Sequence, residues 1–440
     1  DRKARIVIGA RSAIFSPIAN LGLIVVDEEH ENSYKQDTVP RYQARDIAVV
    51  RAQIENCPVV LGSATPSLES WQNTQNGKYE IAEMRQRIDD RKLPLIRVID
   101  MRLESRKQGS GLTILSTKLR EGIERRIADG EQTILFLNRR GFARSIMCPD
   151  CGFVQNCRHC STTMTVHRAD DKLLCHICGF GMLPPRRCPE CNSQAILNAG
   201  FGTEKVEEVL KQVFAGARIA RVDTDSMRKK NQLRSTLDAF KAKKIDILLG
   251  TQMIAKGLHF PNVTLVGILN ADVGLHIPDI RAGERTFQLL TQVAGRAGRG
   301  ELEGEVVVQT FTPHHPAIQH ARHHDFDGFA EQELILRRQF GHPPFIHLAL
   351  ITVRSKHQHR AEFSLKTLHV RLKRNLPDNM VMTEPLPSPL TKSHDQWRFQ
   401  VMLKCGRARA LNQHIQGVME DMSFPDDVIV TVDIDPYNLS

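Results

Sequence analysis

The residues with the clearest capacity for chemistry are eight of the ten cysteines, which form four pairs with two residues between partners. The pairs are Cys148/Cys151, Cys157/Cys160, Cys175/Cys178 and Cys188/Cys191. This spacing lets both thiolates of a tight turn reach one metal ion, and four thiolates complete a tetrahedral zinc site. Disulfide frameworks are typical of small secreted chains, and redox dithiols usually come singly. We therefore predict two structural Zn²⁺ sites, and we expect the unpaired Cys57 and Cys405 to be small buried side chains.

The spacing leaves open which pairs share an ion. We favour a nested arrangement, with Cys148, Cys151, Cys188 and Cys191 on one zinc ion and Cys157, Cys160, Cys175 and Cys178 on the other. One ion then closes the two ends of the module, so that the module can be inserted between flanking segments. A sequential arrangement, in which the first four cysteines bind one ion, remains the alternative.

A second group of reactive residues directly follows an apolar run. The segment LIVV leads into Asp27, Glu28, Glu29 and His30. Carboxylates at the C-terminal end of a buried parallel strand lie where α/β proteins bind ligands. One acid there can hold Mg²⁺, and its neighbour can polarise an attacking water for phosphoryl transfer. An acidic turn without a function is the alternative for this motif taken alone.

Two further segments complete a set suited to phosphoryl transfer. The segment LGSATP ends a second apolar run and presents the hydroxyls of Ser63 and Thr65. The segment QVAGRAGR places Arg296 and Arg299 on one face of a helix, where both can reach a γ-phosphate. A solvated basic helix would not need small residues between its arginines. Together the three segments favour ATP chemistry.

These residues must be positioned by alternating strands and helices. Short β-branched runs predict strands at 21–26, 58–61, 133–137, 245–249, 264–269 and 305–310. Apolar residues three and four apart predict helices at 116–129 and 203–213. Runs that are apolar at every position suit parallel strands covered on both faces, so we predict an α/β fold. The charged stretch 85–111 is the expected linker between lobes, and the chain after about residue 344 has a mixed α+β pattern.

Length and composition exclude several classes of protein. At about 100–200 residues per domain, 440 residues suggest two to four domains. Sixty Lys and Arg against 50 Asp and Glu give a formal charge of +10, which points to polyanions such as nucleic acid. No apolar run approaches the roughly 18 residues of a membrane helix, and no secretory signal opens the sequence. We expect a cytoplasmic protein without membrane contact, and a start at Asp1 inside a longer polypeptide.

In this order, DEEH, GSAT and QVAGRAGR resemble motifs II, III and VI of superfamily 2 helicases. Over nearly the whole chain the resemblance is closer to the bacterial PriA family of primosomal replication restart helicases. The residues that carry it are GARSAIF, DEEHENSYKQDTVPRYQARD, ILFLNRRGFA, the four cysteine pairs, GTEKVEE, GTQMIAKGLHFPNVTLV and PDIRAGERTFQLLTQVAGRAGR. The resemblance implies RecA-like helicase lobes and a 3′→5′ DNA helicase, driven by ATP with Mg²⁺. Such a helicase restarts stalled forks and begins primosome assembly.

The resemblance also implies a role for each matching residue. Asp27 would bind Mg²⁺ and Glu28 would activate the water, while His30, Ser63 and Thr65 would link the nucleotide to the DNA.

Three further sets come from motifs VI and V and from the aromatic-rich loop of the family. Gln292, Arg296 and Arg299 would meet the γ-phosphate from the second lobe. Thr251, Gln252 and Lys256 would touch both the DNA backbone and the nucleotide. Tyr34, Arg41 and Tyr42 fall in the aromatic-rich loop, where an aromatic face can stack on an unpaired base. Two tyrosines in a partly packed loop are the alternative for the last set.

The sequence departs from the family in lacking a G-x-x-x-x-G-K-[ST] loop, whose amides and lysine cradle phosphates. Relatives carry that loop upstream of the region matched here, so we expect this chain alone to hydrolyse little or no ATP. The expected domains are the C-terminal part of lobe 1 at 1–105, lobe 2 at 106–145 and 198–344, the zinc module at 146–197 and an α+β domain at 345–440.

The family's partners are forked and single-stranded DNA, the single-strand binding protein, other primosome proteins and, indirectly, the replicative helicase. We expect the same partners for a monomer at the bacterial nucleoid. Candidates for a surface that receives phosphates or an acidic tail are Trp397, Arg398 and residues 404–409. Zinc-module candidates for contacts with DNA or proteins are Arg158, His159, His176, Arg186 and Arg187. We expect His314, His315, His320, His323 and His324 to be surface side chains rather than metal ligands.

Two other functions remain open. One is a catalytically silent platform for primosome assembly, against which the intact acid pair and arginines argue. The other is a generic zinc-ribbon helicase of DNA repair, which the segments PDIRAGER and QVAGRAGR make the weaker alternative.

Overall fold

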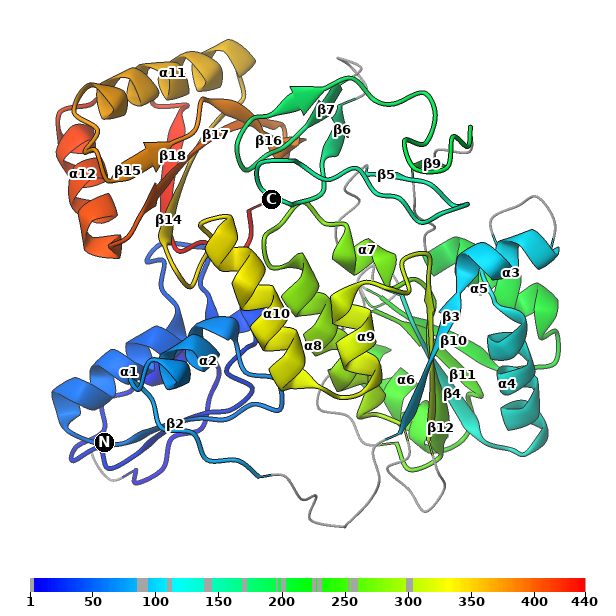
Figure 1. The fold of residues 1–440 in the computed structure, drawn as a ribbon. Coiled ribbons are helices and arrows are strands. Elements are labelled where there is room, and N and C mark those ends of the chain that lie inside the picture. Colours follow the sequence, from blue (N-terminus) through cyan, green and yellow to red (C-terminus); the bar gives the residue numbers. More distant parts are fainter. Residues whose placement is uncertain are drawn as a thin grey trace. The chain divides into compact units, whose positions relative to one another are not determined.

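The structure is a computed structural model, and it describes residues 4–84, 94–108, 113–137, 145–167, 172–194, 197–198, 203–223, 227, 232–251, 254, 260–297 and 304–439. The chain divides into two compact units (Figure 1). Unit 1 comprises Asp1–Ala82, Gly341–Pro385 and Thr391–Leu439. Unit 2 comprises Glu83–Phe340 and Leu386–Leu390.

Unit 2 is built around a six-stranded parallel sheet with the strand order β10-β11-β4-β12-β13-β3. Its strands are β3 (Leu95–Asp100), β4 (Gln132–Phe136), β10 (Ile219–Val222), β11 (Ile247–Gly250), β12 (Val263–Ile268) and β13 (Glu305–Thr310). Strands β4, β11 and β12 are buried at every position, as parallel strands covered on both faces must be. The predicted α/β fold is confirmed.

Helices cover both faces of this sheet (Figure 1). One face carries α6 (Gln232–Lys241), α8 (Ala282–Ala294), α9 (Pro316–Arg322) and α10 (Phe326–Gln339). Their core is centred on Phe240, Phe287 and Phe329. The other face carries α4 (Thr117–Ala128) and α5 (Thr203–Val213), which bury Leu119 and Leu210. Unit 2 also contains α3 (Met101–Gln108) and α7 (Asp272–Leu275).

The structure confirms both predicted helices and places strands within each predicted strand range or within one residue of it. Helix α4 begins after Ser116, whose hydroxyl accepts a hydrogen bond from the Leu119 amide and so caps the helix. No helix in the described part of the chain is long and apolar enough to cross a membrane.

The expected linker at 85–111 is wrong over its described residues, because residues 95–108 form β3 and α3. Strand β3 pairs in parallel with β13 along its whole length. The second lobe therefore starts before the boundary expected at 105. The charge pattern concealed this strand because β3 is an edge strand, and Leu95 and Arg97 are exposed on it.

The cysteine-rich module is an insertion in unit 2 between β4 and α5. Its first and last strands, β5 (Ile146–Met147) and β9 (Leu197–Asn198), pair with each other in antiparallel fashion. A separate three-stranded antiparallel sheet consists of β6 (Thr165–His167), β7 (Lys172–Leu174) and β8 (Gly181–Met182).

Unit 1 has two parts. The first contains the short parallel strands β1 (Ile24–Val26) and β2 (Val59–Leu61). The 3₁₀ helices and α-helices of this part are η1 (Arg11–Phe15), η2 (Asn32–Tyr34), α1 (Ala44–Glu55) and α2 (Leu68–Gln75). Alternate residues of β1, Ile24 and Val26, are buried against α1, where they meet Ala48 and Ala52.

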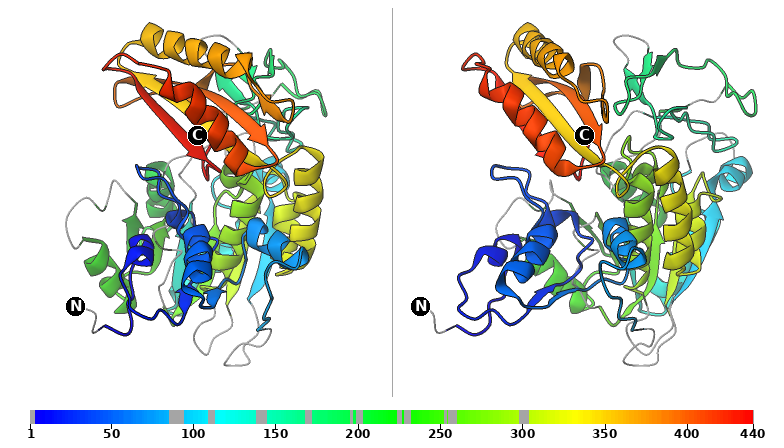
Figure 2. Two further views of the ribbon diagram at one scale, coloured as in Figure 1. Left: turned by 90° about the vertical axis from the view of Figure 1, so that its left-hand side faces the viewer. Right: turned by 60° about the vertical axis from the view of Figure 1, so that its left-hand side comes forward.

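The second part of unit 1 has the α+β fold expected after residue 344. Its strands are β14 (His347–Ser355), β15 (Met380–Met382), β16 (Leu386–Ser393), β17 (Gln396–Cys405) and β18 (Ile429–Ile434). They follow the order β15-β17-β14-β18, with β16 also paired to β17. Helices α11 (Gln358–Arg374) and α12 (Ala408–Glu420) pack on the same face of the sheet (Figure 2). Cys405 is buried in this core, as expected, whereas Cys57 is only half-buried and packs against the core of the first part.

Gln309 joins three segments of unit 2 by its side chain, which is completely buried. Its Nε2 donates to the carbonyls of Ile114 (2.8 Å) and Leu269 (3.1 Å), and its Oε1 accepts from the amide of Ser116 (2.7 Å). One side chain thus satisfies backbone groups at the start of α4 and after β12.

We expect Gln309→Leu to lower the free energy of unfolding of unit 2 by several kcal/mol. The change leaves three buried backbone groups without partners, each at a cost of about 1–3 kcal/mol. Urea denaturation followed by circular dichroism measures the effect. The control is Gln212→Leu, on the exposed side of α5, for which we expect a change within about 0.5 kcal/mol. Equal urea midpoints for the two variants would contradict the stabilising role that we assign to the Gln309 side chain.

Candidate functional site

Motifs II and III lie side by side at one end of the β1–β2 pair. Asp27 and Glu28 directly follow β1, and Gly62 directly follows β2. The two segments are joined by backbone hydrogen bonds from Gly62 to Val26 (2.8 Å) and from Glu29 to Gly62 (3.0 Å). Parallel strands end at the same edge, which explains why these motifs meet. The acidic segment and the hydroxyl segment, each of which follows an apolar run in the sequence, therefore meet at one edge.

Glu28 has a left-handed backbone conformation, with φ of 48°. Left-handed backbone is uncommon for a residue with a side chain and is found at sites where surrounding contacts fix it. Here the Glu28 amide donates to the Asp27 carboxylate at 3.0 Å. The turn leaves Asp27 exposed and Glu28 half-buried, so both carboxylates remain accessible.

His30 and Ser63 connect the two motifs through side chains. The His30 Nδ1 atom lies 2.7 Å from Ser63 Oγ and 3.6 Å from Glu28 Oε2. Ser63 Oγ also accepts the amide of Thr65 at 3.0 Å. The structure thus brings together four residues that the sequence singled out, in one chain of contacts running from Glu28 to Thr65.

Glu29, the third residue of the DEEH motif, has a different role that the sequence did not reveal. It is 1% exposed, and its carboxylate accepts hydrogen bonds from the Arg45 guanidinium (3.2 Å), the Ser67 amide (2.6 Å) and the hydroxyls of Ser67 and Ser70 (both 3.0 Å). Burial alone would lower the pKa of Arg45, but Tyr437, Asp46 and Glu29 raise it well above its usual value. Glu29 is therefore a buried structural carboxylate that joins motif II to α1 and α2.

The aromatic-rich loop packs against motif II. The Tyr34 hydroxyl donates to the Asp27 carbonyl at 2.6 Å, and its ring packs against the core of β1 and β2. Burial and the nearby carboxylates, Asp27 first among them, raise the pKa of Tyr34, so it remains a hydrogen-bond donor. The Tyr42 ring meets Phe15 edge-on, with centroids 5.0 Å apart. The half-buried Arg41 lies near the Asp433 carboxylate.

Three of the predicted second-lobe residues lie at the ends of elements in unit 2. Gln292 is in the last turn of α8, whereas Arg296 lies in the turn beyond the cap residue Gly295, so the expected helical position of Arg296 is wrong. Thr251 follows β11, and its amide donates to the Val222 carbonyl at 3.3 Å. Gln252, Lys256 and Arg299 lie outside the described residues.

The eight cysteines form two clusters of four, and the clusters follow the nested arrangement. One contains Cys148, Cys151, Cys188 and Cys191, and the other Cys157, Cys160, Cys175 and Cys178. Sulfur–sulfur distances across the first cluster include 3.6 Å for Cys148–Cys191 and 3.5 Å for Cys151–Cys188. A tetrahedral site with Zn–S bonds of about 2.3 Å has edges of about 3.8 Å, so the thiols fit zinc.

The surroundings of the sulfurs also fit a metal. The Phe153 amide donates to Cys151 Sγ and the His159 amide to Cys157 Sγ, both at 3.4 Å. Burial, with the neighbouring thiols, raises the pKa of Cys151 to about 12. For Cys188, burial is outweighed by the amides of Cys191 and Glu190, which lower its pKa to about 7. Four thiolates this close together repel one another, so they cannot all be deprotonated without a cation. Binding of Zn²⁺ would stabilise the four thiolates and release their protons.

The first cluster is anchored to the second-lobe fold. From α3, Arg102 Nη1 donates to the Cys151 carbonyl (2.8 Å) and Arg106 Nη2 to the Asp150 carbonyl (2.9 Å). Gly152, with φ of +79°, approaches the Phe311 carbonyl so closely that a Cβ atom would overlap it. The turn that carries Cys148 and Cys151 is therefore in direct backbone contact with lobe 2.

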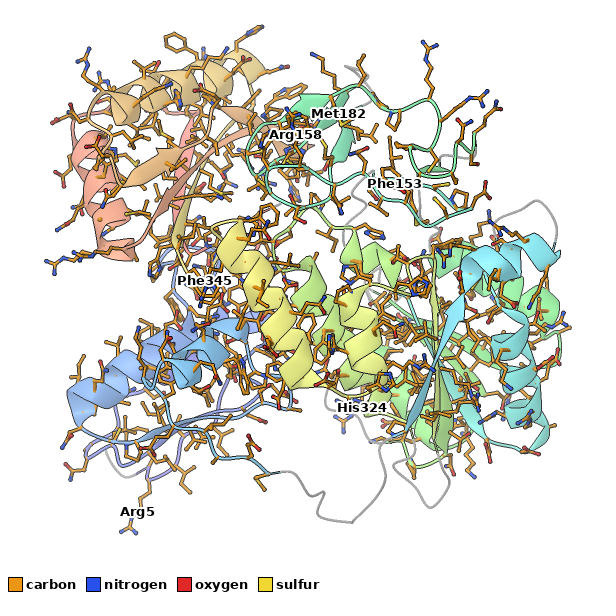
Figure 3. All side chains as sticks on the ribbon, in the orientation of Figure 1. Arg5, Phe153, Arg158, Met182, His324 and Phe345 are labelled. Atoms are coloured by element: carbon orange, nitrogen blue, oxygen red, sulfur yellow. The ribbon has the colours of Figure 1, made fainter. Side chains whose placement is uncertain are left out.

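The remaining candidates of the module differ in exposure. Arg158, labelled in Figure 3, has its guanidinium carbon 4.4 Å from the centre of the Phe180 ring. His159, Arg186 and Arg187 are exposed, as expected for contact residues. His176 is buried and bonds to His167 (3.1 Å) and to the Pro387 carbonyl (3.1 Å), so its interpretation as a contact residue is wrong.

Of the histidine cluster, His314 and His323 are exposed as expected, whereas His315, His320 and His324 are half-buried. His315 lies at the start of α9, where its side chain accepts the Ala317 amide, and desolvation, with His276 nearby, lowers its pKa to about 4. His320 bonds to Asp325 (2.8 Å), and His324 bonds to the Pro94 carbonyl (3.2 Å).

In the C-terminal fold, Arg398 lies opposite Arg354 on the neighbouring strand. Burial, with the charge of Arg354, lowers the pKa of Arg398. The Lys392 ammonium lies 5.5 Å from the centre of the Trp397 ring. The anion-receptive surface expected at these residues stays a prediction, with which the basic groups beside an aromatic ring are compatible.

Paired cysteine substitutions test the zinc arrangement. With nested sites, Cys148→Ser/Cys191→Ser removes two ligands from one site, so we expect one bound Zn²⁺ per chain after dialysis. Cys148→Ser/Cys157→Ser damages both sites, so we expect zinc content well below one. Elemental analysis measures the ratio of zinc to protein in each variant. A sequential arrangement predicts the reverse order, so the comparison decides between the two.

Comparison with known proteins gives matches along the chain. Three family models match: the PriA DNA helicase Cys-rich region domain at residues 157–182, the helicase conserved C-terminal domain at 190–301, and the primosomal protein N C-terminal domain at 338–437. Two of these matches coincide with the zinc module and with the C-terminal α+β fold. The third falls on the sheet of unit 2.

Curated relatives match over nearly the whole chain. The replication restart protein PriA of Bacillus subtilis is 45% identical over 439 residues, covering 99% of this chain and 54% of that protein. Those of Treponema pallidum and Haemophilus influenzae are each 41% identical, covering 99% and 100% of this chain and 65% and 60% of their own lengths. The chain thus spans between half and two thirds of the length of these relatives. With the paired cysteine clusters and the motif II–III geometry, these matches mean that the chain belongs to the PriA family of replication restart proteins.

Proposed function

We propose that this chain is part of an ATP-dependent 3′→5′ DNA helicase that acts on stalled or branched replication forks and begins primosome assembly. The observation that carries this proposal is the contact of His30 with Ser63 at 2.7 Å, which ties the acidic motif to the hydroxyl motif. A contact of this kind can report the state of an acidic nucleotide site to a neighbouring segment. An acidic turn without a function would not need it.

The accessible carboxylates account for the chemical step. Asp27 would hold Mg²⁺ with ATP, which supplies charge neutralisation at the phosphates. Glu28 would orient and polarise the attacking water, and the hydrogen bond from its amide to the Asp27 carboxylate holds the two residues in one turn. Gln292, Arg296 and Arg299 would stabilise the charge that develops on the γ-phosphate. This sequence contains no G-x-x-x-x-G-K-[ST] loop, so the proposed site would need a phosphate-cradling loop from outside these 440 residues.

The remaining predicted residues would serve nucleic acid and partners. Thr251, Gln252 and Lys256 would contact the DNA backbone, and Tyr42 and Arg41 the single strand beside motif II. Tyr34 is the weaker candidate for base stacking, because its hydroxyl and ring are both engaged. The Arg354–Arg398 surface suits phosphates or the acidic tail of a single-strand binding protein.

We expect Glu28→Gln to reduce DNA-stimulated ATP hydrolysis at least about 100-fold, the usual contribution of a positioned general base. The assay uses the product of the entire reading frame, with and without forked DNA. Glutamine keeps the shape of the side chain and removes its basicity, so DNA binding should be unchanged.

Glu55→Gln, at the end of α1 on the same lobe, is the matched control and should leave turnover unchanged. Loss of turnover in Glu28→Gln alone supports a motor. Absence of turnover in the wild-type protein would overturn the helicase proposal in favour of an assembly platform.

A further inference from the structure

Lys35, in the loop after motif II, is buried against the C-terminal fold of unit 1. Its side chain is 6% exposed, and its ammonium lies 2.7 Å from the Asp433 carboxylate. It also donates to the carbonyls of Ile434 (2.9 Å) and Asp435 (3.3 Å). The Lys35 ammonium is thereby surrounded by one carboxylate, with which it forms an ion pair, and by two carbonyl oxygens at the end of β18.

This ion pair joins two segments almost 400 residues apart in the sequence. Burial raises the pKa of Asp433, and the charges of Lys35 and Arg41 oppose that effect. A buried lysine that loses its partners costs several kcal/mol of stability. The loop that carries Lys35 is therefore stabilised in its position on β18. Tyr437, a few residues beyond β18, also lies close to Arg45. The C-terminal segment therefore supplies a carboxylate that neutralises Lys35 next to motif II.

On the other side, the same loop is fastened to motif II. Tyr34 is the neighbour of Lys35, and its hydroxyl donates to the Asp27 carbonyl at 2.6 Å. The backbone of Lys35 is held too, because its carbonyl accepts from the Arg11 guanidinium at 2.7 Å. Fixing Lys35 on β18 thus fixes Tyr34, and Tyr34 fixes the peptide that carries the Asp27 carboxylate.

We propose that the C-terminal fold positions the motif II carboxylates through Lys35 and Tyr34, which act as positioning residues for the Mg²⁺–ATP site. The proposal rests on the proposed function and deepens it. The C-terminal strand becomes a structural part of the nucleotide site, in addition to any role it has in binding partners. A simple packing contact between the two folds would need neither a buried charge nor a hydroxyl aimed at Asp27.

The test measures ATP turnover by the full-length protein with forked DNA, as a function of free Mg²⁺. We expect Lys35→Met, Asp433→Asn and Tyr34→Phe each to raise the Mg²⁺ concentration for half-maximal rate by about three- to tenfold, the effect of losing one hydrogen bond. Tyr34→Phe keeps the ring, so it separates the hydroxyl from base stacking. Lys366→Met, which breaks an exposed ion pair with Glu362 on α11, is the matched control and should change nothing.

A double variant separates positioning from general destabilisation. If Lys35 acts through Tyr34, Lys35→Met/Tyr34→Phe should raise the Mg²⁺ requirement no further than the stronger single variant, because contacts in one chain are not additive. Effects that multiply, or an unchanged Mg²⁺ requirement in Lys35→Met and Asp433→Asn, would overturn the inference while leaving the motor intact. No turnover in the wild-type protein would overturn both proposals.

Discussion

The nucleotide end of unit 1 depends on one buried charge, the carboxylate of Glu29. A carboxylate removed from water must be compensated, and losing one partner of a buried pair costs about 3–5 kcal/mol. Glu29 is compensated by Arg45 from α1 and by Ser67 and Ser70 around the start of α2. This network joins motif II to both helices, and the bond from the Glu29 amide to the Gly62 carbonyl joins motif II to motif III. The carboxylates of Asp27 and Glu28 lie outside the network and remain accessible.

Much of the fold and of the site could be predicted from local patterns. Strands β4, β11, β12 and β13 each contain an uninterrupted or nearly uninterrupted apolar run, so their burial between two layers of helices follows from the sequence. The zinc module could be predicted because two-residue spacing between cysteines has few other uses. The meeting of motifs II and III followed from the rule that parallel strands end at one edge.

The remaining features depend on contacts that no local pattern contains. Glu28 and Glu29 are neighbours of the same type, and the difference between an accessible and a buried carboxylate arises from Arg45 and Ser67, which come much later in the chain. Strand β3 reads as charged linker because it has one neighbour in the sheet and exposes alternate side chains. Lys35 looks like any surface lysine until β18 supplies its acceptors. Burial of a polar residue is set by its partners, and those are distant in sequence.

The pairing of β5 with β9 has a consequence for how such a protein can vary. The two strands that begin and end the cysteine-rich module run side by side, so the chain enters and leaves the module at neighbouring points. Because the two ends of the module are adjacent, the flanking elements β4 and α5 connect to neighbouring points. The distance between those points does not depend on the size of the module. The module can therefore lengthen, shrink or exchange its inner knuckles over evolutionary time without rerouting the parallel sheet. Gly152 is an exception, because it packs against the Phe311 carbonyl with no room for a side chain and so constrains this part of the module.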